Sequence, residues 1–541
     1  MDYSLLVSSF MQQHAQQGWP RQRMLHECLR AAIRDGTLAA GTRLVATRTL
    51  AAELGMARNT VLYAYEQLVC EGYAVSDRRG TLVAPVTAVA VAARAAGAAT
   101  AVTAATAATA AAPAAGAPHP SLSRRARNLR EVGGPAHQMG AFVPGVPALD
   151  AFPAAHWRRL LDKTWRGLNP AQLNYGDPAG ELVLRAAIAD HLRASRGVLC
   201  DASQVFITDG TQSSLDLCAR ACADDGDTVW IEHPGYLGAL AAFRGAGLKV
   251  EGIAVDEDGI APTPRDWLSR PPRLIYTTPS HQYPLGGVLT LERRLSLIEH
   301  ARAAGALIIE DDYDSEFRHD GPPLSAMQGL APAAPVLYLG TFSKTMFPAL
   351  RIGFLVAPQG LAEPLARMRA QSAARGRVAD QLALAEFLRS GQFALHLRRM
   401  RRLYRQRRDV LVAALQRHLG AIAEVHGASA GMHLALRFTD PALDDADISA
   451  RLLRQGIVAH SLGSHATAGA GTGPGAGAGT GPGAGAGAGE GRAPAWHGLM
   501  LGYAQIPVDL MDGFVRRLAA VIHLAAYEAR PALSASGGSR R

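Results

Sequence analysis

Two stretches of low complexity divide this 541-residue sequence and limit where a folded core can form. The first, Ala84–Pro118, holds 20 alanines in 35 residues and no acidic residue. It has no large apolar face that could dock, so we expect a linker despite the helix propensity of alanine. In the second, glycine occupies every odd position from Gly469 to Gly491. So few side chains cannot offset the backbone entropy, and we expect a disordered surface-loop insertion over residues 467–491.

These breaks predict a small folded unit over residues 18–86, an alanine-rich linker over 87–135 and a large unit over 136–530. A chain of this length has room for several domains, so it needs neither disulfides nor a structural metal to bury a core. The five cysteines form no C-x-x-C pair and no zinc-ligand spacing, which indicates reduced thiols in a cytoplasmic protein and no metal site.

The composition argues against secreted and membrane classes. The first residues show no basic stretch followed by an apolar one, so we expect no export signal. No run of about 18 strongly apolar residues is present, so we expect no membrane span. The formal net charge of +9 is mild and does not by itself indicate nucleic acid. The chain has only three lysines, Lys163, Lys249 and Lys344, so any chemistry that needs a deprotonatable amine has three candidates.

The small unit has the element order of a winged helix-turn-helix. Apolar residues at helical spacing predict a first helix with one buried face: Leu25, Cys28, Leu29, Ala32 and Ile33. A short second helix is expected over about Thr47–Leu54, ended by Gly55, and a third over about 58–72. The inner stripe of the third helix is Val61, Ala64, Tyr65 and Leu68. A short hairpin over 73–83 follows.

Basic and polar residues lie where such a fold contacts DNA. Side chains at the start of the third helix can meet base edges and phosphates. A residue of the second helix and two at the hairpin tip could reach the backbone or the minor groove. The candidates are Arg58, Asn59, Thr60, Arg48, Arg78 and Arg79. The alternative is an ordinary helical bundle with solvated arginines, and the small net charge of this region alone would favour it.

The order of residues favours DNA binding. The runs Gly41–Leu44 (GTRL), Thr47–Ala51 (TRTLA) and Leu54–Val61 (LGMARNTV), with a later Glu-Gly-Tyr, resemble the GntR-type DNA-binding domain. Val45-Ala46 replaces the family's Pro-Ser, and Ala57 replaces the usual serine before the arginine of the third helix. This change removes a hydroxyl that would cap the helix and contact phosphate, and we expect it to weaken DNA binding by about 1 kcal/mol.

The large unit alternates short apolar runs with helical stretches, which predicts an α/β fold with a mostly parallel sheet and helices on both faces. Ligands of such folds bind beyond the carboxyl ends of the strands. Polar residues follow several expected strands there. They lie in the segments Thr208–Gln212, Glu232–Tyr236, Leu307–Tyr313 and Thr341–Lys344, with Arg351 seven residues further on.

Together these residues are the parts that a pyridoxal 5′-phosphate (PLP) site requires. A lysine amine condenses with the aldehyde, an acid keeps the pyridine nitrogen protonated, and a helix start binds the phosphate. Each part alone is weak, because a tyrosine beside a strand is ordinarily core and an Asp-Asp pair is ordinarily a solvated loop. Their joint occurrence at successive strand ends favours the cofactor.

Longer motifs resemble the MocR/PdxR group, in which a GntR-type regulator is fused to a fold-type I aminotransferase-like domain. They are Thr278–Gly286 (TPSHQYPLG), Ile309–Phe317 (IEDDYDSEF) and Gly340–Gly353 (GTFSKTMFPALRIG). The segments Tyr175–Gly180 and His396–Arg401 are similar too, so the likeness spans nearly all of the chain outside the linker and the glycine-rich insertion.

The resemblance implies a role for each matching residue. Lys344 would form the aldimine with PLP, Asp311 would pair with the pyridine nitrogen, Tyr313 would bond the ring hydroxyl and Tyr236 would stack on the ring. The phosphate would be held by Gly210, Thr211, Gln212, Thr341 and Arg351, and Tyr175 would reach the site of a partner subunit. Either His281 or Gln282 would line the ring hydroxyl.

One departure concerns catalysis. Fold-type I aminotransferases usually anchor the substrate carboxylate with an arginine near the C-terminus, but Trp496–Tyr503 has none. A two-point arginine–carboxylate pair is hard to replace with a neutral group, so efficient transamination is not expected.

The sequence therefore predicts a cytoplasmic transcription regulator that binds double-stranded DNA as a homodimer. Its PLP-binding domain would sense an effector, with a small amine or amino acid as a possible ligand. Two alternatives remain: a working PLP-dependent aminotransferase with an accessory DNA-binding domain, and a DNA binder whose large domain is a cofactor-free dimerisation scaffold.

Overall fold

The computed structural model describes residues 2–14, 17–77, 80–84, 123, 126, 140–321, 324–372, 376–467 and 496–529. The expected linker over 87–135, apart from two single residues, and the glycine-rich insertion beyond Thr467 lie outside the described residues, as do Arg78 and Arg79. The chain forms two compact units, residues 1–119 and residues 120–541, and each is considered separately.

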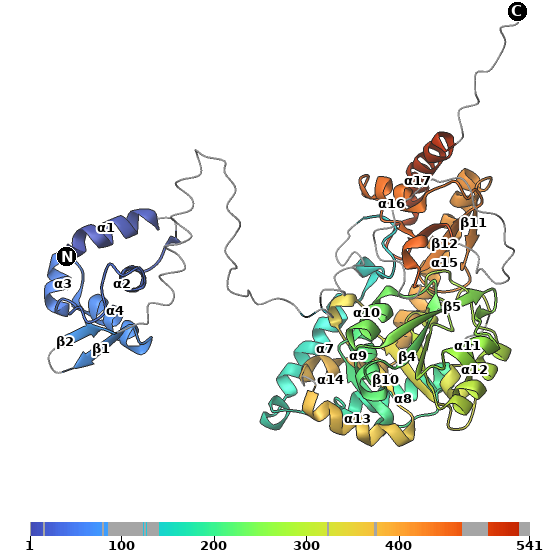
Figure 1. Ribbon diagram of the computed structural model, residues 1–541, viewed down its shortest axis with the longest axis horizontal. Helices are drawn as coiled ribbons and strands as arrows, with labels where there is room; N and C mark the ends of the chain where they lie inside the picture. The colour runs from blue at the N-terminus through green and yellow to red at the C-terminus, as the bar shows by residue number, and fades with distance from the viewer. Residues whose placement is uncertain are drawn as a thin grey trace, which may run out of the picture. The chain divides into compact units, whose positions relative to one another are not determined.

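The N-terminal unit is a helical core with a two-stranded wing, seen in blue in Figure 1. Its elements are α1 (Tyr3–Gln13), α2 (Arg21–Arg34), α3 (Thr47–Glu53), α4 (Arg58–Cys70), β1 (Ala74–Asp77) and β2 (Gly80–Val83). The buried residues of α4 are Val61, Ala64, Tyr65 and Leu68, which confirms the predicted inner stripe. The predicted buried face of α2 is confirmed as well.

Helix α1 precedes the expected start of this unit at residue 18. Its Tyr3 and Val7 are buried in the same core as Leu25 and Leu29 of α2, so the folded unit begins earlier than the hydrophobic pattern of α2 indicates. The Tyr65 hydroxyl donates a hydrogen bond of 2.8 Å to the Val45 carbonyl and thereby joins α4 to the segment that leads into α3.

The large unit contains an eight-stranded sheet in the order β3-β10-β9-β8-β7-β4-β5-β6. The strands are β3 (Val205–Thr208), β4 (Thr228–His233), β5 (Lys249–Asp256), β6 (Gly259–Ile260), β7 (Leu274–Thr277), β8 (Leu307–Asp312), β9 (Val336–Thr341) and β10 (Gly353–Val356). Neighbours from β5 through β9 run parallel, while β10 is antiparallel to both β9 and β3. The predicted mostly parallel sheet is confirmed.

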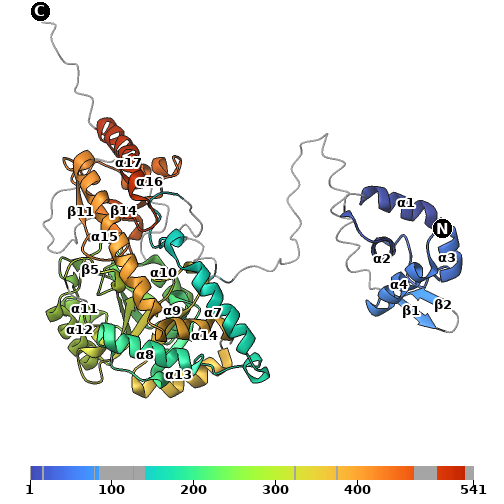
Figure 2. The ribbon, with the colours of Figure 1, turned by 180° about the vertical axis from the view of Figure 1, so that it is seen from behind.

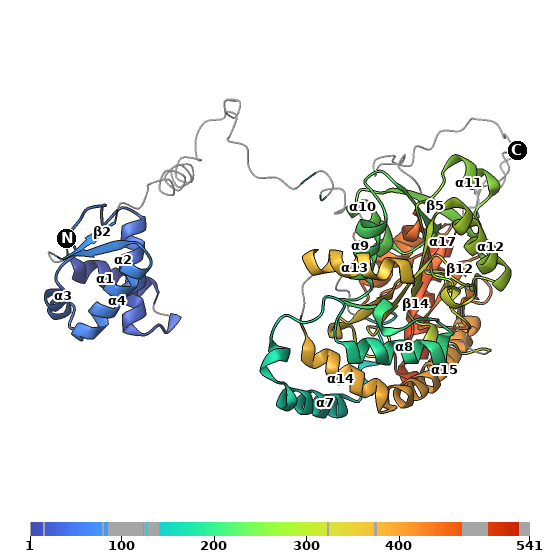
Figure 3. The ribbon, with the colours of Figure 1, turned by 90° about the horizontal axis from the view of Figure 1, so that it is seen from below.

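Helices cover both faces of this sheet because alternate strand residues are apolar on each side. Leu337 and Leu339 of β9 belong to the core beneath α9 (Thr211–Cys222) and α10 (Leu237–Gly245), whereas Val336 belongs to the core beneath α12 (Leu291–Ala304). Figure 3 shows α9 on one side of the sheet and α12 on the other. The remaining helices of this part are α7 (Ala154–Gly167), α8 (Leu182–Arg196), α11 (Pro264–Ser269), α13 (Gln359–Ser372) and α14 (Val378–Arg389).

A second, antiparallel sheet in the order β11-β12-β14-β13 forms the C-terminal part of the unit, drawn in orange and red in Figure 2. Its strands are β11 (Ala423–His426), β12 (His433–Phe438), β13 (His460–Ser461) and β14 (Gly498–Gly502). The long helix α15 (Gln392–Leu419), α16 (Asp445–Leu453) and α17 (Val508–Glu528) pack around it. At about 1.5 Å per residue, α15 is about 42 Å long, enough to run beside both sheets.

Candidate functional site

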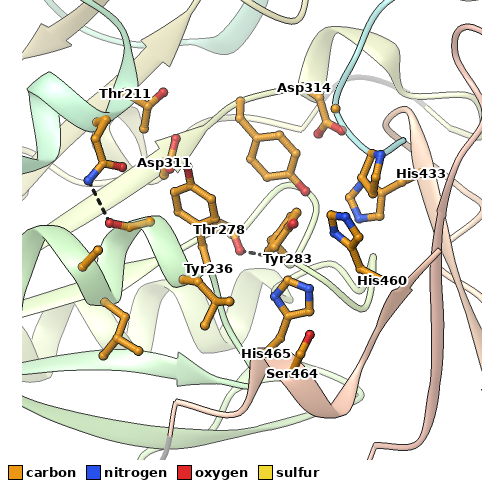
Figure 4. Close-up of a pocket in the computed structure, with 18 of the residues that line it drawn as sticks. Thr211, Tyr236, Thr278, Tyr283, Asp311, Asp314, His433, His460, Ser464 and His465 are labelled. Atoms are coloured by element: carbon orange, nitrogen blue, oxygen red, sulfur yellow. Dashed lines mark hydrogen bonds between the residues drawn. The ribbon is translucent and has the colours of Figure 1, made fainter. Parts of the chain in front are cut away.

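A cavity of about 1190 Å³ lies where the carboxyl ends of the parallel strands face the second sheet. Eight of the predicted cofactor residues line it: Lys344, Asp311, Tyr313, Tyr236, Thr211, Gln212, Thr341 and Arg351. Figure 4 shows Thr211 and Asp311 on one side of this pocket and His433, His460 and His465 on the other. The sheet topology explains why these residues lie together, because β4, β8 and β9 all end at this edge of the sheet.

Lys344 follows β9 and is held at the pocket by neighbours distant in sequence. Its Nζ donates a hydrogen bond of 2.8 Å to the carbonyl of Gly145. The next residue, Thr345, is held by α15: the Nε2 of His396 lies 2.8 Å from the Thr345 carbonyl oxygen. Burial lowers the pKa of Lys344 below its ordinary value, although Asp314 and Asp311 oppose the shift. A lowered pKa increases the fraction of unprotonated, nucleophilic amine.

Asp311, in β8, is a buried carboxyl group with one unused acceptor. Its Oδ2 accepts a hydrogen bond of 2.8 Å from the Tyr276 hydroxyl, whereas its Oδ1 has no partner among the described residues. Burial, reinforced by Asp312 and Glu232, raises the pKa of Asp311 to about 7. A buried acceptor without a partner is costly, so this oxygen suits a ligand that brings an N–H donor into the pocket.

The N-terminus of α9 forms a second polar corner. Gly210 precedes the helix with a φ of +96°, and a Cβ there would lie 3.3 Å from the Arg351 guanidinium. Gly210 itself does not line the cavity but allows Arg351 to approach the helix start. Backbone N–H groups, the helix dipole and a guanidinium make a suitable phosphate site.

Tyr236 stands directly before α10, beside this corner. Gly238 lies under its ring, because a Cβ at that position would fall 2.3 Å from the ring carbon that bears the hydroxyl. The amide of Gln212 donates a hydrogen bond of 2.9 Å to the Gly238 carbonyl, so α9 and α10 are joined at the pocket.

Other predicted residues lie elsewhere. His281 is buried behind Tyr313: the tyrosine hydroxyl donates 2.8 Å to the His281 carbonyl and lies 3.0 Å from its Nδ1. The Gln282 amide donates to Glu232, Pro234 and Tyr283. Neither side chain lines the cavity, and Tyr175 is 87% exposed outside it.

The sequence analysis missed several pocket residues. Tyr283 immediately follows the His281-Gln282 pair, so the motif around it was a usable signal. The C-terminal residues His433, His460 and His465 belong to no recognised motif. The pairing of β12, β14 and β13 brings His433 and His460 to the cavity, and His465 lies in the short turn after β13.

The N-terminal unit presents a polar surface at α3 and α4. Arg48, Arg58 and Asn59 are exposed, and Thr60 is half-buried in the first turn of α4. Ala57 occupies the N-cap of α4 and supplies no side-chain hydrogen bond to the helix. These residues leave the start of α4 accessible, as a recognition helix requires.

Comparison with known proteins identifies both units. Residues 21–83 match the family described as bacterial regulatory proteins, gntR family, and residues 147–473 match aminotransferase class I and II. The probable rhizopine catabolism regulatory protein MocR of Rhizobium meliloti is 43% identical, over 79% of this chain and 83% of that protein. The pyridoxine biosynthesis regulator PdxR of Corynebacterium glutamicum is 32% identical, over 77% and 83% of the two chains.

Solved structures support the fold of the large unit. The α-aminoadipate aminotransferase LysN of Thermus thermophilus, solved with N-(5′-phosphopyridoxyl)-L-leucine, is 25% identical with a TM-score of 0.61, over 75% of this chain and 96% of that one. A kynurenine aminotransferase of Pyrococcus horikoshii has a TM-score of 0.62 over 75% and 95% of the chains, at 23% identity. The chain belongs to the family of DNA-binding transcription regulators in which a GntR-type helix-turn-helix domain is fused to an aminotransferase-like domain.

Proposed function

We propose that the large unit of this regulator binds PLP and uses it to sense an amine. The observation that carries the proposal is that Lys344 and Asp311 line one cavity, and that one Asp311 oxygen has no hydrogen-bond partner among the described residues and so could accept a ring N–H. The residues present fit the cofactor, because the same cavity also holds an aromatic ring and a phosphate corner.

Each residue has a distinct task in this proposal. PLP, when bound, supplies an aldehyde that reacts reversibly with amines and a ring that withdraws electrons. Lys344 brings the amine, and its lowered pKa keeps part of it unprotonated. Asp311 holds a proton on the ring nitrogen, Tyr236 covers the ring, and Arg351 with the start of α9 binds the phosphate.

A sensor also has to change DNA binding. The ligand would favour one arrangement of the DNA-binding units, which requires that it bind the two arrangements with different affinities. Two half-sites call for a homodimer, and the exposed Tyr175 is suited to contact a partner subunit. Action on DNA would place the protein in the cytoplasm. Among the described helices, none is both long and apolar enough to cross a membrane.

The catalytic alternative is weaker. The region in which aminotransferases carry their carboxylate-binding arginine corresponds here to β14, whose residues Gly498–Gly502 are all buried and uncharged. The cofactor-free scaffold is disfavoured as well, because a scaffold would not need to keep a lysine and an acid unpaired with each other in one cavity.

The proposal is tested by titrating the purified full-length protein with PLP and recording its absorbance. We expect a new band in the visible or near-ultraviolet that is lost in Lys344→Ala and kept in Lys163→Ala, whose lysine is an exposed residue of α7. A mobility-shift assay on the intergenic region beside the gene should then respond to PLP in the wild type only. A Lys344→Ala protein that shows the same band and response would contradict the proposal.

A further inference from the structure

We propose that the wall of the pocket formed by the second sheet is a subsite for the uncharged, hydroxyl-bearing part of an amine ligand, and not for a carboxylate. This inference rests on the proposed function, because the amine end of the ligand would be taken up at Lys344. It goes further by naming the chemical class of the other end.

Three histidines form this wall, which we call the imidazole wall: His433, the first residue of β12; His460, the first residue of β13; and His465, which ends the short turn Gly463–His465. Figure 4 shows the three rings together on one side of the pocket, next to Tyr283. The centre of the Tyr283 ring lies 5.5 Å from that of His433 and 5.3 Å from that of His465. The histidines and the tyrosine thus form one continuous surface.

The imidazole wall has hydrogen-bonding capacity that the described residues do not use. His433 and His465 are 1% and 4% exposed, and both line the cavity. The Nε2 of His433 has no hydrogen-bond partner among the described residues, and the His465 ring, which lies beside the Gly235 backbone, leaves at least one of its nitrogens without one. Buried polar atoms normally have partners, so these nitrogens point to a ligand that supplies them.

The neighbouring His281 differs from the histidines of the wall because its ring already has a side-chain partner. His281 lies behind the wall, and its Nδ1 is 3.1 Å from the carboxylate of Asp314. His281, Asp314 and His433 could each place one ligand atom within 4.8 Å of the others, the arrangement of a metal site. The pairing of His281 with Asp314 already satisfies two of the three groups, so the open capacity lies on the pocket side.

The charge of the wall decides which ligand group fits. Burial, together with the neighbouring histidines, lowers the pKa of His433 well below its ordinary value, and burial lowers the pKa of His465 to about 4. Near neutral pH these rings are uncharged. Strand β14, which lies between β12 and β13, contributes no charged side chain.

Three cations also line the cavity, Lys344, Arg351 and Arg244, but none of them is a residue of the imidazole wall or of β14. A carboxylate at the wall would therefore meet neutral imidazoles, whose acceptor nitrogens it cannot use, and no cation of the wall itself. A hydroxyl group, which both donates and accepts, matches a neutral imidazole, which also does both.

Two serines extend the same surface. Ser461 and Ser464 line the cavity beside His460 and His465. The Ser464 hydroxyl donates 2.7 Å to the Ser461 carbonyl, and the Ser464 N–H donates to the Ser461 hydroxyl, which leaves hydroxyl lone pairs for a ligand. The wall as a whole therefore suits a polyhydroxylated amine.

The test compares three amines with the same carbon skeleton. 2-Aminopropane-1,3-diol carries two hydroxyls, serine replaces one hydroxymethyl group by a carboxylate, and 2-aminopropane has neither. Each is titrated by calorimetry into PLP-loaded, full-length protein at pH 7.5. We expect the diol to bind at least about tenfold more tightly than either of the others, because one satisfied buried hydrogen bond is worth about that factor.

Variants assign the preference to the wall. His433→Phe and His465→Phe keep an aromatic ring but remove its nitrogens, so each should weaken diol binding about tenfold while leaving 2-aminopropane binding unchanged. His300→Asn, on the exposed face of α12, is the matched control and should bind all three amines like the wild type. The PLP absorbance band of each variant verifies that its pocket is folded.

Failure of the inference and failure of the proposed function are distinguishable. A protein that never acquires a PLP band refutes the proposed function, and the inference falls with it. A PLP-loaded protein that binds serine as tightly as the diol refutes the inference alone, as does a diol preference that survives both histidine variants. Diol binding that requires added Zn²⁺ also overturns it, because the imidazoles would then be metal ligands.

Discussion

At the scale of single residues, the pocket is an arrangement of groups whose hydrogen bonds are incomplete without a ligand. Asp311 has one oxygen without a hydrogen-bond partner among the residues that the structure describes, and burial makes its ionised form costly. Glu232, by contrast, is equally buried but accepts hydrogen bonds from Thr277, Thr278 and Gln282. The difference indicates that Glu232 supports the fold, whereas Asp311 is kept at the expense of stability.

Asp311→Asn is therefore expected to stabilise the cofactor-free large unit. The pKa of Asp311 is about 7 in the folded chain and about 4 in the unfolded chain, so ionisation destabilises the fold increasingly from about pH 4 to about pH 7 and by a constant amount above. Asparagine cannot ionise. We therefore expect the free energy of unfolding of the Asp311→Asn variant at pH 8 to exceed that of the wild type by on the order of 2 kcal/mol, with a smaller difference at pH 5.

Urea denaturation of the large unit at pH 8 and pH 5 checks this expectation. Asp190→Asn, at an exposed residue of α8, is the control and should show no such pH-dependent gain. A substitution at Asp311 that lowers stability at pH 8, or that raises it equally at both pH values, would contradict the reasoning. PLP affinity should fall in Asp311→Asn, because a neutral amide can accept a hydrogen bond from a protonated ring nitrogen but cannot form an ion pair with it.

At the scale of elements, local sequence patterns predicted some features of the fold and the pocket but not others. The buried stripes of α2 and α4 follow from helical spacing alone, and Lys344 was identified by its place after the apolar strand β9. The imidazole wall was not predictable in this way. His433 pairs with Gly502 in β14, and His460 pairs with Met500 of the same strand, so only long-range antiparallel pairing brings them together.

The N-cap of α4 offers a test at this scale. The methyl side chain of Ala57 cannot accept a hydrogen bond, so the first turn of α4 has no side-chain cap. Ala57→Ser should raise the free energy of unfolding of the N-terminal unit by about 1 kcal/mol and should tighten DNA binding. Thermal denaturation and a mobility-shift titration measure the two effects.

Ala52→Ser in the last turn of α3 is the matched control, because it adds the same hydroxyl to an exposed position that has no free helix N–H to satisfy. We expect it to be neutral or slightly destabilising. Equal stabilisation by both serines would show that the effect at position 57 is not capping.

At the scale of the whole molecule, the chain has two units with separate cores. The N-terminal core closes on itself through α1, α2, α4 and the wing, with Leu25, Leu29 and Leu68 fully buried. The large unit has its own sheets and cores. The low-complexity stretch between them predicted this division, although the sequence pattern did not reveal that α1 belongs to the first core.

A fragment of residues 1–119 should consequently fold alone. We expect a cooperative thermal transition by circular dichroism and DNA binding at least about tenfold weaker than that of the full-length protein. The weakening follows because the fragment lacks the large unit that we propose holds two DNA-binding units together and raises their effective concentration at adjacent half-sites. An unfolded fragment, or one that binds as tightly as the full-length protein, would contradict this expectation.

The hydrogen bond between Lys344 and Gly145 has a consequence for how the pocket communicates with the rest of the chain. Gly145 belongs to the stretch through which the polypeptide enters the large unit, which is also fastened by Ala141 to Gly456 and by Phe142 to Gly502. A ligand that binds the Lys344 amine would break its hydrogen bond to Gly145. If PLP is taken up at Lys344 as we propose, cofactor binding and the anchoring of the segment around Gly145 would therefore compete for the same nitrogen atom.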